Sequence, residues 1–319
     1  MSNELSNKMK YSPLGRTGLR VSTLALGTAA FGLENYGIQE PGEAGLLSED
    51  RSIALVRAAV DRGINFFDTA RGYGASEAVL GKGLNGDSSC VVATKVGISA
   101  ADKDSAELTA TMMDSIETSL KALRRDVLDI VQIHNATQDV LERGEVLDVL
   151  ERARETGKLK FIGASVYGEP AALAAIRSGR VDVLQVAVNL LDQRMLTTVL
   201  PAARKKNVGI VARSVLLKGV LTERARLLPD GLRDLSQAAD QMRQALGETW
   251  NSLPGTALRF CFSVPGVHSV LIGLRTLPEL VFALAAQEAG PLDVAAMQKA
   301  DLLKLNDEQL LNPSLWPTL

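Results

Sequence analysis

Four residues of this sequence could together form an acid–base centre. Asp68 ends the apolar run INFF, and Lys95 ends the apolar run CVVAT. A charged side chain inside an apolar strand is costly unless it is paired, so each is the other's candidate partner. Tyr73 follows in RGYG, and His134, one of two histidines in the chain, ends LDIVQIH. These residue types suggest proton transfer.

The chemistry that such a group suits is general acid–base catalysis on a carbonyl or an alcohol. A tyrosine has a pKa near 10, and a nearby ammonium would lower it by favouring the phenolate. A carboxylate would hold the lysine, and the histidine would orient a carbonyl or relay the proton. The sequence offers no nucleophile–base pair for acyl transfer and no metal-ligand spacing.

Each residue also has a purely structural interpretation. Asp68 and Lys95 would then be an ion pair on a rim, His134 a hydrogen-bonded core residue, and Tyr73 a packed turn residue. We interpret His268, which precedes the last apolar run, as structural. A hydrolase that uses Asp68 and His134 is a further alternative, and it predicts no cofactor binding.

Short apolar runs, rich in β-branched residues, predict the strands that would position these side chains. Their continuous apolar character is typical of strands covered on both faces. The eight runs are Leu24–Gly27, Ile64–Asp68, Cys90–Lys95, Leu128–His134, Phe161–Ser165, Val183–Val188, Ile210–Ser214 and Val270–Gly273.

Amphipathic segments between the runs predict helices. The expected helices are Glu49–Arg62 with Ser48 as its N-cap, Ala106–Arg125, Val140–Lys158, Pro170–Ser178, Thr197–Lys206, Thr256–Phe262 and Pro278–Ala286. This alternation predicts an α/β fold, a closed (β/α)8 TIM barrel, in which polar residues at the carboxyl ends of the strands form the active site. An open doubly wound sheet is the alternative, disfavoured because no G-x-G-x-x-G follows the first strand.

Three segments lie outside the repeated units. Residues 9–22 read as a β-hairpin that plugs the N-terminal end of the barrel, and Val294–Leu305 as an extra helix followed by a tail. Ala29–Gly45 reads as a long functional loop. We expect residues 1–319 to form a single domain.

The composition of the chain limits the kinds of partner and the location that we expect. The formal net charge is −2, with both signs mixed along the chain, which gives no reason to expect nucleic acid or a membrane as partner. The N-terminal residues lack the apolar stretch of a secretory signal, and Cys90 and Cys261 match no metal or redox spacing. We expect a cytoplasmic protein with two buried thiols.

In several motifs the sequence resembles the aldo-keto reductase family, over about residues 10–285. The motifs are PLGRTGLRVSTLALGT, GINFFDTARGYGASEAVLGKGL, VVATKVG, LDIVQIHN, GKLKFIGAS and LQVAVNLLDQR. The resemblance implies that Asp68, Tyr73, Lys95 and His134 are the catalytic tetrad. Tyr73 would be the acid in reduction and the base in oxidation, and His134 would help bind the carbonyl.

The resemblance also implies a nicotinamide cofactor across the carboxyl ends of the strands. Ser165 and Gln185 would hold the carboxamide, and Gly27, Thr28, Ala29 and Asp68 would lie along the ribose. Ser214, Leu216 and Lys218 would border the pyrophosphate, and Gly273 and Arg275 the adenosine end. Because a guanidinium suits a 2′-phosphate, NADPH is favoured and NADH is the alternative.

The sequence departs from the commoner family pattern at several positions. Val166 stands where most members have Asn. Arg213 stands where many have an aromatic residue against the nicotinamide, and we predict that its planar face stacks there. Glu279 and Ala283 replace the usual Gln and Asn, and Glu279 would disfavour a phosphate. SVYGEP, LLDQR and RSVLLKG resemble a bacterial branch related to sugar and aldose dehydrogenases.

The expected function is reduction of a polar aldehyde or ketone, such as a sugar aldehyde, with Tyr73 as the general acid. The loop Ala29–Gly45, the residues after Lys95 and His134, and the tail would set the substrate. The candidate aromatic side chains there are Phe31, Tyr36, Tyr167 and Trp316. A cofactor-binding regulatory protein of the same fold, with little turnover, is the alternative.

Overall fold

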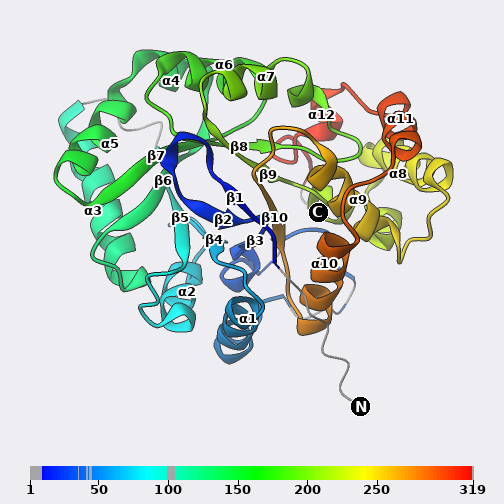
Figure 1. The fold of residues 1–319 in the computed structure, drawn as a ribbon, viewed down its shortest axis with the longest axis horizontal. Coiled ribbons are helices and arrows are strands. Elements are labelled where there is room, and N and C mark those ends of the chain that lie inside the picture. The colour runs from blue at the N-terminus through cyan, green and yellow to red at the C-terminus, as the bar shows by residue number, and fades with distance from the viewer. Residues whose placement is uncertain (1–8, 35, 41, 43–44, 99–104, 318–319) are drawn as a thin grey trace.

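Eight parallel strands form a closed barrel in this protein (Figure 1). The computed structural model describes residues 9–34, 36–40, 42, 45–98 and 105–317. The barrel strands are β3 (Leu24–Gly27), β4 (Phe66–Asp68), β5 (Val91–Val96), β6 (Leu128–Ala136), β7 (Leu159–Val166), β8 (Val183–Ala187), β9 (Gly209–Arg213) and β10 (Ser269–Gly273). β10 pairs with β3 and closes the ring. The eight expected strands and the TIM barrel are confirmed.

Helices surround the barrel (Figure 1). They are α1 (Glu49–Asp61), α2 (Ser76–Leu84), α3 (Ser105–Leu123), α4 (Gln138–Arg143), α5 (Glu145–Glu155), α6 (Glu169–Ser178), α7 (Val199–Lys205), α8 (Arg233–Leu246), α9 (Leu253–Ser263), α10 (Leu277–Ala289), α11 (Val294–Leu302) and α12 (Glu308–Leu311). The Ser48 hydroxyl caps α1 by accepting from Arg51 N, as expected.

The helices differ from the expectations at several places. The single helix Val140–Lys158 is wrong: Gly144, at φ 80°, ends α4 and begins α5. α8 was not predicted, and neither was α2, whose glycines lower helix propensity. Packing explains why α2 has glycines. A Cβ on Gly81 would lie 2.3 Å from Ala122 O, and a Cβ on Gly83 would lie 2.8 Å from Val56 Cβ. Neighbouring helices approach α2 too closely for any side chain there.

The predicted hairpin plug is confirmed. β1 (Tyr11–Pro13) pairs antiparallel with β2 (Arg20–Ser22), and the hairpin lies across one end of the barrel (Figure 1). Its Leu14 and Val21 pack in one buried cluster with barrel residues that include Phe66 and Ile130. The Arg16 guanidinium holds the turn by pairing with Asp182 at 2.8 Å.

The C-terminal part packs outside the barrel. α11 contacts α8, and the Trp316 indole donates to Leu310 O at 3.0 Å. Cys90 and Cys261 are both buried and unbonded, as expected. Among the described helices none is by itself long and apolar enough to cross a membrane; α10 and α11 pass that test only together and are bent by 114°.

Candidate active site

The Asp68 carboxylate and the Lys95 ammonium form an ion pair at the carboxyl ends of β4 and β5. Lys95 is 1% exposed and Asp68 is 3% exposed. Asp68 Oδ2 also accepts from Gln132 Nε2 at 2.9 Å and from Gln185 Nε2 at 2.8 Å, and Lys95 Nζ donates to Thr69 O at 2.9 Å. Because hydrogen bonds to charged groups are the strong ones, these contacts compensate for the burial of both charges.

Buried hydrogen bonds fix the loop that carries Tyr73. Ser76 Oγ donates to Thr28 O at 2.9 Å and lies 2.9 Å from the Thr69 hydroxyl. At Gly32 a Cβ would lie 1.8 Å from Tyr73 O, so the segment after β3 reaches the loop only because residue 32 is glycine. The loop is thereby held against the end of β3.

A second ion pair, half-buried, supports the same loop from the other side. Glu77, which is buried, accepts from Arg71 Nη1 at 2.6 Å and from the Thr94 hydroxyl at 2.6 Å. Arg71 N also donates to Lys95 O at 3.3 Å. Tyr73 therefore lies on a short loop tied to both β4 and β5.

Tyr73, Lys95 and His134 meet at the mouth of the barrel. Lys95 Nζ lies 4.9 Å from the centroid of the Tyr73 ring. The Tyr73 and His134 ring centroids are 5.6 Å apart at an interplanar angle of 85°, an edge-to-face contact. The structure thus brings all four predicted catalytic side chains into one cluster.

The electrostatics of this cluster differ in one respect from the sequence-based expectation. Burial raises the pKa of Tyr73 above its ordinary value, and the Asp68 charge adds to that rise, while Arg213 opposes it. We expected the lysine to lower this pKa; burial, reinforced by the Asp68 charge, raises it instead. Burial, followed by the Lys95 charge, lowers the pKa of His134 to about 4. At neutral pH the site holds a protonated phenol beside a neutral imidazole.

A β-bulge aims the His134 side chain. The pairing register between β6 and β7 shifts between Ile133 and Ala136, and Asn135 has φ 53°. Bulges often redirect a side chain next to an active site, and asparagine tolerates this left-handed backbone better than most residues. The asparagine after His134 therefore has a geometric role that its spacing in the sequence did not indicate.

The residues predicted to hold the carboxamide lie next to the catalytic cluster. Ser165 and Gln185 are paired in register at the ends of β7 and β8. Ser165 Oγ donates to Gln185 Oε1 at 3.4 Å, while Gln185 Nε2 donates to Asp68. The Gln185 amide thus connects the Ser165 hydroxyl to the catalytic carboxylate.

The residues predicted to contact the ribose and the adenosine end of the cofactor lie at the ends of β3 and β10. Gly27 pairs directly with Gly273. Thr28 Oγ1 donates to Asp68 O at 3.0 Å and is buried, and Ala29 begins a buried turn of 3-10 helix. Because both residues are glycines, neither has a side chain that would separate a ligand from the backbone at this edge.

The predicted pyrophosphate residues lie on an unusual turn after β9. Ser214, Leu217 and Lys218 all have positive φ, between 45° and 57°. Such alternation of backbone conformation can turn successive N–H groups towards one anion. Leu216 lies within the turn, and burial lowers the pKa of Lys218. A cationic side chain and strained backbone therefore occur together where phosphates were predicted.

Arg213, which ends β9, reaches across to the end of β7. Its guanidinium carbon lies 4.1 Å from the centroid of the Tyr167 ring, and its Nη2 donates to Val166 O at 2.8 Å. Its buried Nε has no hydrogen-bond partner, and the guanidinium has no acidic partner within the part of the chain that the structure describes. Arg213 therefore contributes positive charge close to Tyr73 and His134.

The residues predicted at the adenosine end form the start of α10. Thr276 and Glu279 form a capping box, and Glu279 Oε2 accepts from Arg275 N at 2.6 Å. Arg275 Nη2 donates to Gly45 O at 2.7 Å. The Glu279 carboxylate thus occupies backbone N–H groups that would otherwise be available to a phosphate.

The aromatic residues proposed as substrate lining divide into two groups. Burial, followed by the neighbouring Tyr73 phenol, raises the pKa of Tyr36 to about 12, although 39% of this residue is exposed. Tyr167 contacts Arg213, so both tyrosines lie near the cluster. Phe31 is fully packed in the core. Residues 35, 41, 43–44 and 99–104, parts of the predicted substrate loops, lie outside the described residues.

The Aldo/keto reductase family model matches residues 23–303. The chain belongs to the aldo-keto reductase family. It is 30% identical to the L-galactose dehydrogenase of Arabidopsis thaliana, over 98% of both chains. It is 29% identical to the NADH-specific methylglyoxal reductase of Escherichia coli, over 67% of this chain and 69% of that protein. In fold it matches the aldo-keto reductase AKR11C1 from Bacillus halodurans (holo form), with a TM-score of 0.77, 24% identity and coverage of 95% of this chain and 100% of that one.

This aldo-keto reductase has sugar-dehydrogenase-like relatives, as the motifs suggested. Sequence reasoning missed Gln132 and Glu77, which support the catalytic cluster. Gln132 lies two residues before His134 in the same strand, so the alternation of β6 was the available signal. The buried acid of Glu77 within an apolar helix was the signal for its ion pair.

Proposed function

We propose that this chain reduces the carbonyl group of a small polar aldehyde or ketone, with NADPH or NADH as the reductant. The observation that carries the proposal is the cluster of half-buried Tyr73 and His134 around the buried Lys95–Asp68 ion pair. A nicotinamide, when bound, would supply the hydride. The residues of this chain supply the proton and the charge that the reaction needs.

Tyr73 is the proton donor in this proposal. Its raised pKa keeps the phenol protonated at neutral pH, and a developing alkoxide oxygen is basic enough to take that proton. The resulting phenolate would be stabilised by the Lys95 ammonium and by Arg213, which already lowers the pKa of Tyr73. Asp68 holds the Lys95 ammonium in position through their ion pair.

His134 is proposed to orient the substrate oxygen. With a pKa of about 4 its imidazole is neutral at physiological pH, so it can donate one hydrogen bond without adding charge. The bulge at Asn135 directs the ring to the edge of Tyr73. The oxygen would then lie between the phenol and the imidazole.

The residues at the strand ends suit a dinucleotide. The buried, unpartnered Arg213 Nε, the Lys218 ammonium and the positive-φ turn between them are groups that bind anions or aromatic rings. Ser165 and Gln185 would hold the carboxamide, and the backbone at Gly27 and Gly273 would lie along the rest of the dinucleotide. We keep the stacking of the nicotinamide on Arg213 as a proposal.

The choice between the two cofactors depends on opposite charges at the start of α10. Arg275 favours the 2′-phosphate of NADPH, whereas Glu279 opposes it and already caps the local N–H groups. One relative in this family is NADH-specific by name, so NADH stays an alternative. We propose NADPH as the better ligand, with a preference that Glu279 reduces.

The proposed substrate is a sugar-like aldehyde or the corresponding alcohol. The L-galactose dehydrogenase relative supports a sugar, and the tyrosine hydroxyls of Tyr36 and Tyr167 offer hydrogen-bonding partners to a polyol. The cytoplasmic location expected from the sequence stays a prediction.

Titration of the purified protein with NADPH and with NADH, followed by the fluorescence of its two tryptophans, tests this proposal. We expect saturable binding of both, tighter for NADPH, followed by turnover with sugar aldehydes. Failure of both nucleotides to bind would overturn the proposal. Tight binding without turnover on any carbonyl would favour the regulatory alternative.

A further inference from the structure

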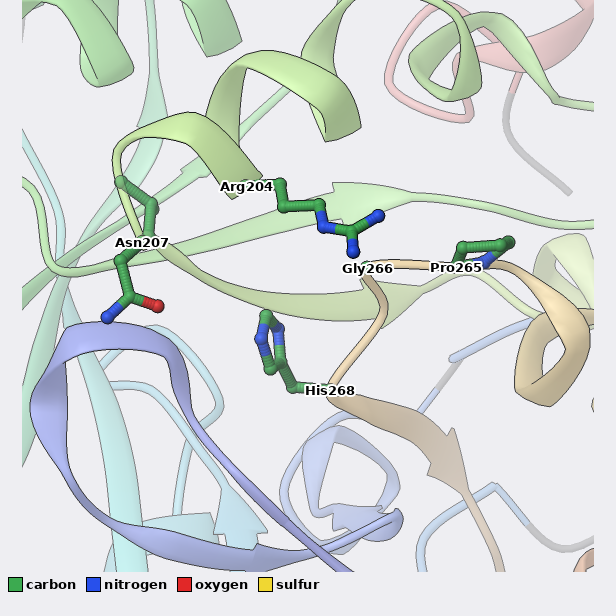
Figure 2. A pocket seen from close by; sticks show the side chains of 6 residues that line it. Arg204, Asn207, Pro265, Gly266 and His268 are labelled. Atoms are coloured by element: carbon green, nitrogen blue, oxygen red, sulfur yellow. The ribbon is translucent and has the colours of Figure 1, made fainter.

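A small cavity lies at the end of the barrel opposite the catalytic cluster. It is lined by the end of α7 and the segment that leads into β10, and its volume is about 250 Å³ (Figure 2). The residues that line it are Arg204, Asn207, Val208, Pro265, Gly266 and His268. The strands β9 and β10 begin here, so the cavity is separated from Tyr73 by the length of the barrel.

Arg204 supplies a cationic group to this cavity. Figure 2 shows its side chain reaching from α7 over the cavity, with the His268 ring on the other side. In the described part of the chain no carboxylate pairs with Arg204 and no acceptor binds its guanidinium, whereas many other arginines here are paired. Its hydrogen-bond donors are available to a ligand.

The tautomer of His268 follows from one hydrogen bond. The backbone N–H of Ile210 donates to His268 Nδ1 at 2.9 Å, so that nitrogen carries no proton. Burial lowers the pKa of His268, which keeps the ring neutral at neutral pH. The ring proton is therefore on Nε2, and the polar group that His268 has left to offer is a donor.

Acceptors are scarce around the cavity. None of its lining residues is acidic. Two of the carbonyl groups at the end of α7 are engaged: Ala203 O accepts from Lys206 N and Val208 N, and Arg204 O accepts from Asn207 N. A ligand here meets a guanidinium, an imidazole N–H and a side-chain amide.

We propose that this cavity binds a small oxyanion, either a free phosphate ion or the phosphoryl group of a small metabolite. A guanidinium binds phosphate oxygens in a fork, and a neutral imidazole N–H adds a third donor. The volume is below the roughly 300–1,000 Å³ of pockets for drug-sized ligands, which favours an ion over a dinucleotide. The site is separate from the proposed oxidoreductase function, and either can fail without the other.

Phosphate titration read by NMR of the histidine side chains tests this site. The chain has two histidines, so a His134→Asn variant assigns both sets of resonances. At constant ionic strength, held with sodium chloride, we expect saturable shifts of the His268 resonances with phosphate and none of the His134 resonances. Glycerol phosphate, titrated in the same way, distinguishes the free ion from a bound phosphoryl group; binding of either supports the site.

Two charge-removing variants separate a built site from general screening. Arg204→Gln should weaken the phosphate affinity at least tenfold, whereas Lys206→Gln, an exposed cation two residues away that does not line the cavity, should change it less than twofold. The proposal is overturned if His268 shows no saturable shift, or if both variants lose the same affinity. Unchanged thermal unfolding of Arg204→Gln would show that the variant still folds.

Discussion

Replacing Lys95 by Met should destabilise the protein strongly, because it leaves a buried carboxylate without its cation. Asp68 is 3% exposed and would keep only the amide donors of Gln132 and Gln185. Removing one partner of a buried ion pair typically costs roughly 3–5 kcal/mol, and the two amides favour the lower end of that range. We therefore expect a loss of about 3 kcal/mol in the free energy of unfolding.

A double-mutant cycle in urea measures the coupling directly. In Lys95→Met combined with Asp68→Asn, neither charge remains, so the double variant should lose about 2 kcal/mol less than the sum of the single changes. Lys160→Met is the matched control. Lys160 pairs with the buried Asp129, but its side chain is 52% exposed and Asp129 keeps Arg125 Nη1 at 3.8 Å, so the change should cost less than about 1 kcal/mol. Additive single changes, or equal losses at Lys95 and Lys160, would refute the argument from burial.

The remaining predictions concern protons and phosphate. Burial lowers the pKa of His134 from 6.5 to about 4, so between these pH values the imidazole is protonated in the unfolded chain and neutral in the folded one. The free energy of unfolding should therefore fall as the pH drops from 6.5 towards 4. The urea midpoint of His134→Gln should depend less on pH than that of the wild-type protein, and an unchanged dependence would contradict this. Arg275→Ala should weaken NADPH binding much more than NADH binding, whereas Glu279→Gln, which keeps the capping geometry, should tighten NADPH selectively. Equal changes for both nucleotides in fluorescence titrations would show that neither residue reads the 2′-phosphate.

The barrel was predictable because its strands are buried on both faces. Continuous apolar runs such as CVVAT and LDIVQ have few other interpretations, and the structure places the strands within two residues of the runs. The break at Gly144 and the helix α2 were not predictable in the same way. The break depends on the left-handed backbone of Gly144, and α2 depends on tertiary packing around its glycines, which overrides their low local helix propensity.

The catalytic residues could be predicted because their positions conflict with their surroundings. Burying a lysine or an aspartate in an apolar strand is costly unless the two charges are paired, so their positions predicted the ion pair. The direction of the shift in the Tyr73 pKa could not be predicted, since it depends on how deeply the folded structure buries the phenol and on the Asp68 charge beside it. The capping role of Glu279 and the bulge at Asn135 likewise depend on backbone geometry that no residue spacing reveals.

The central claim is that the Tyr73 phenol delivers the proton, and Tyr73→Phe tests it most directly. The substitution removes one hydroxyl and keeps the ring that packs against His134 and Lys95. We predict that kcat for aldehyde reduction falls by about 10²–10⁴-fold, the usual contribution of a general acid, while the dissociation constant of NADPH changes less than twofold. A variant that retains full turnover would contradict the assignment of Tyr73 and with it the proposed mechanism.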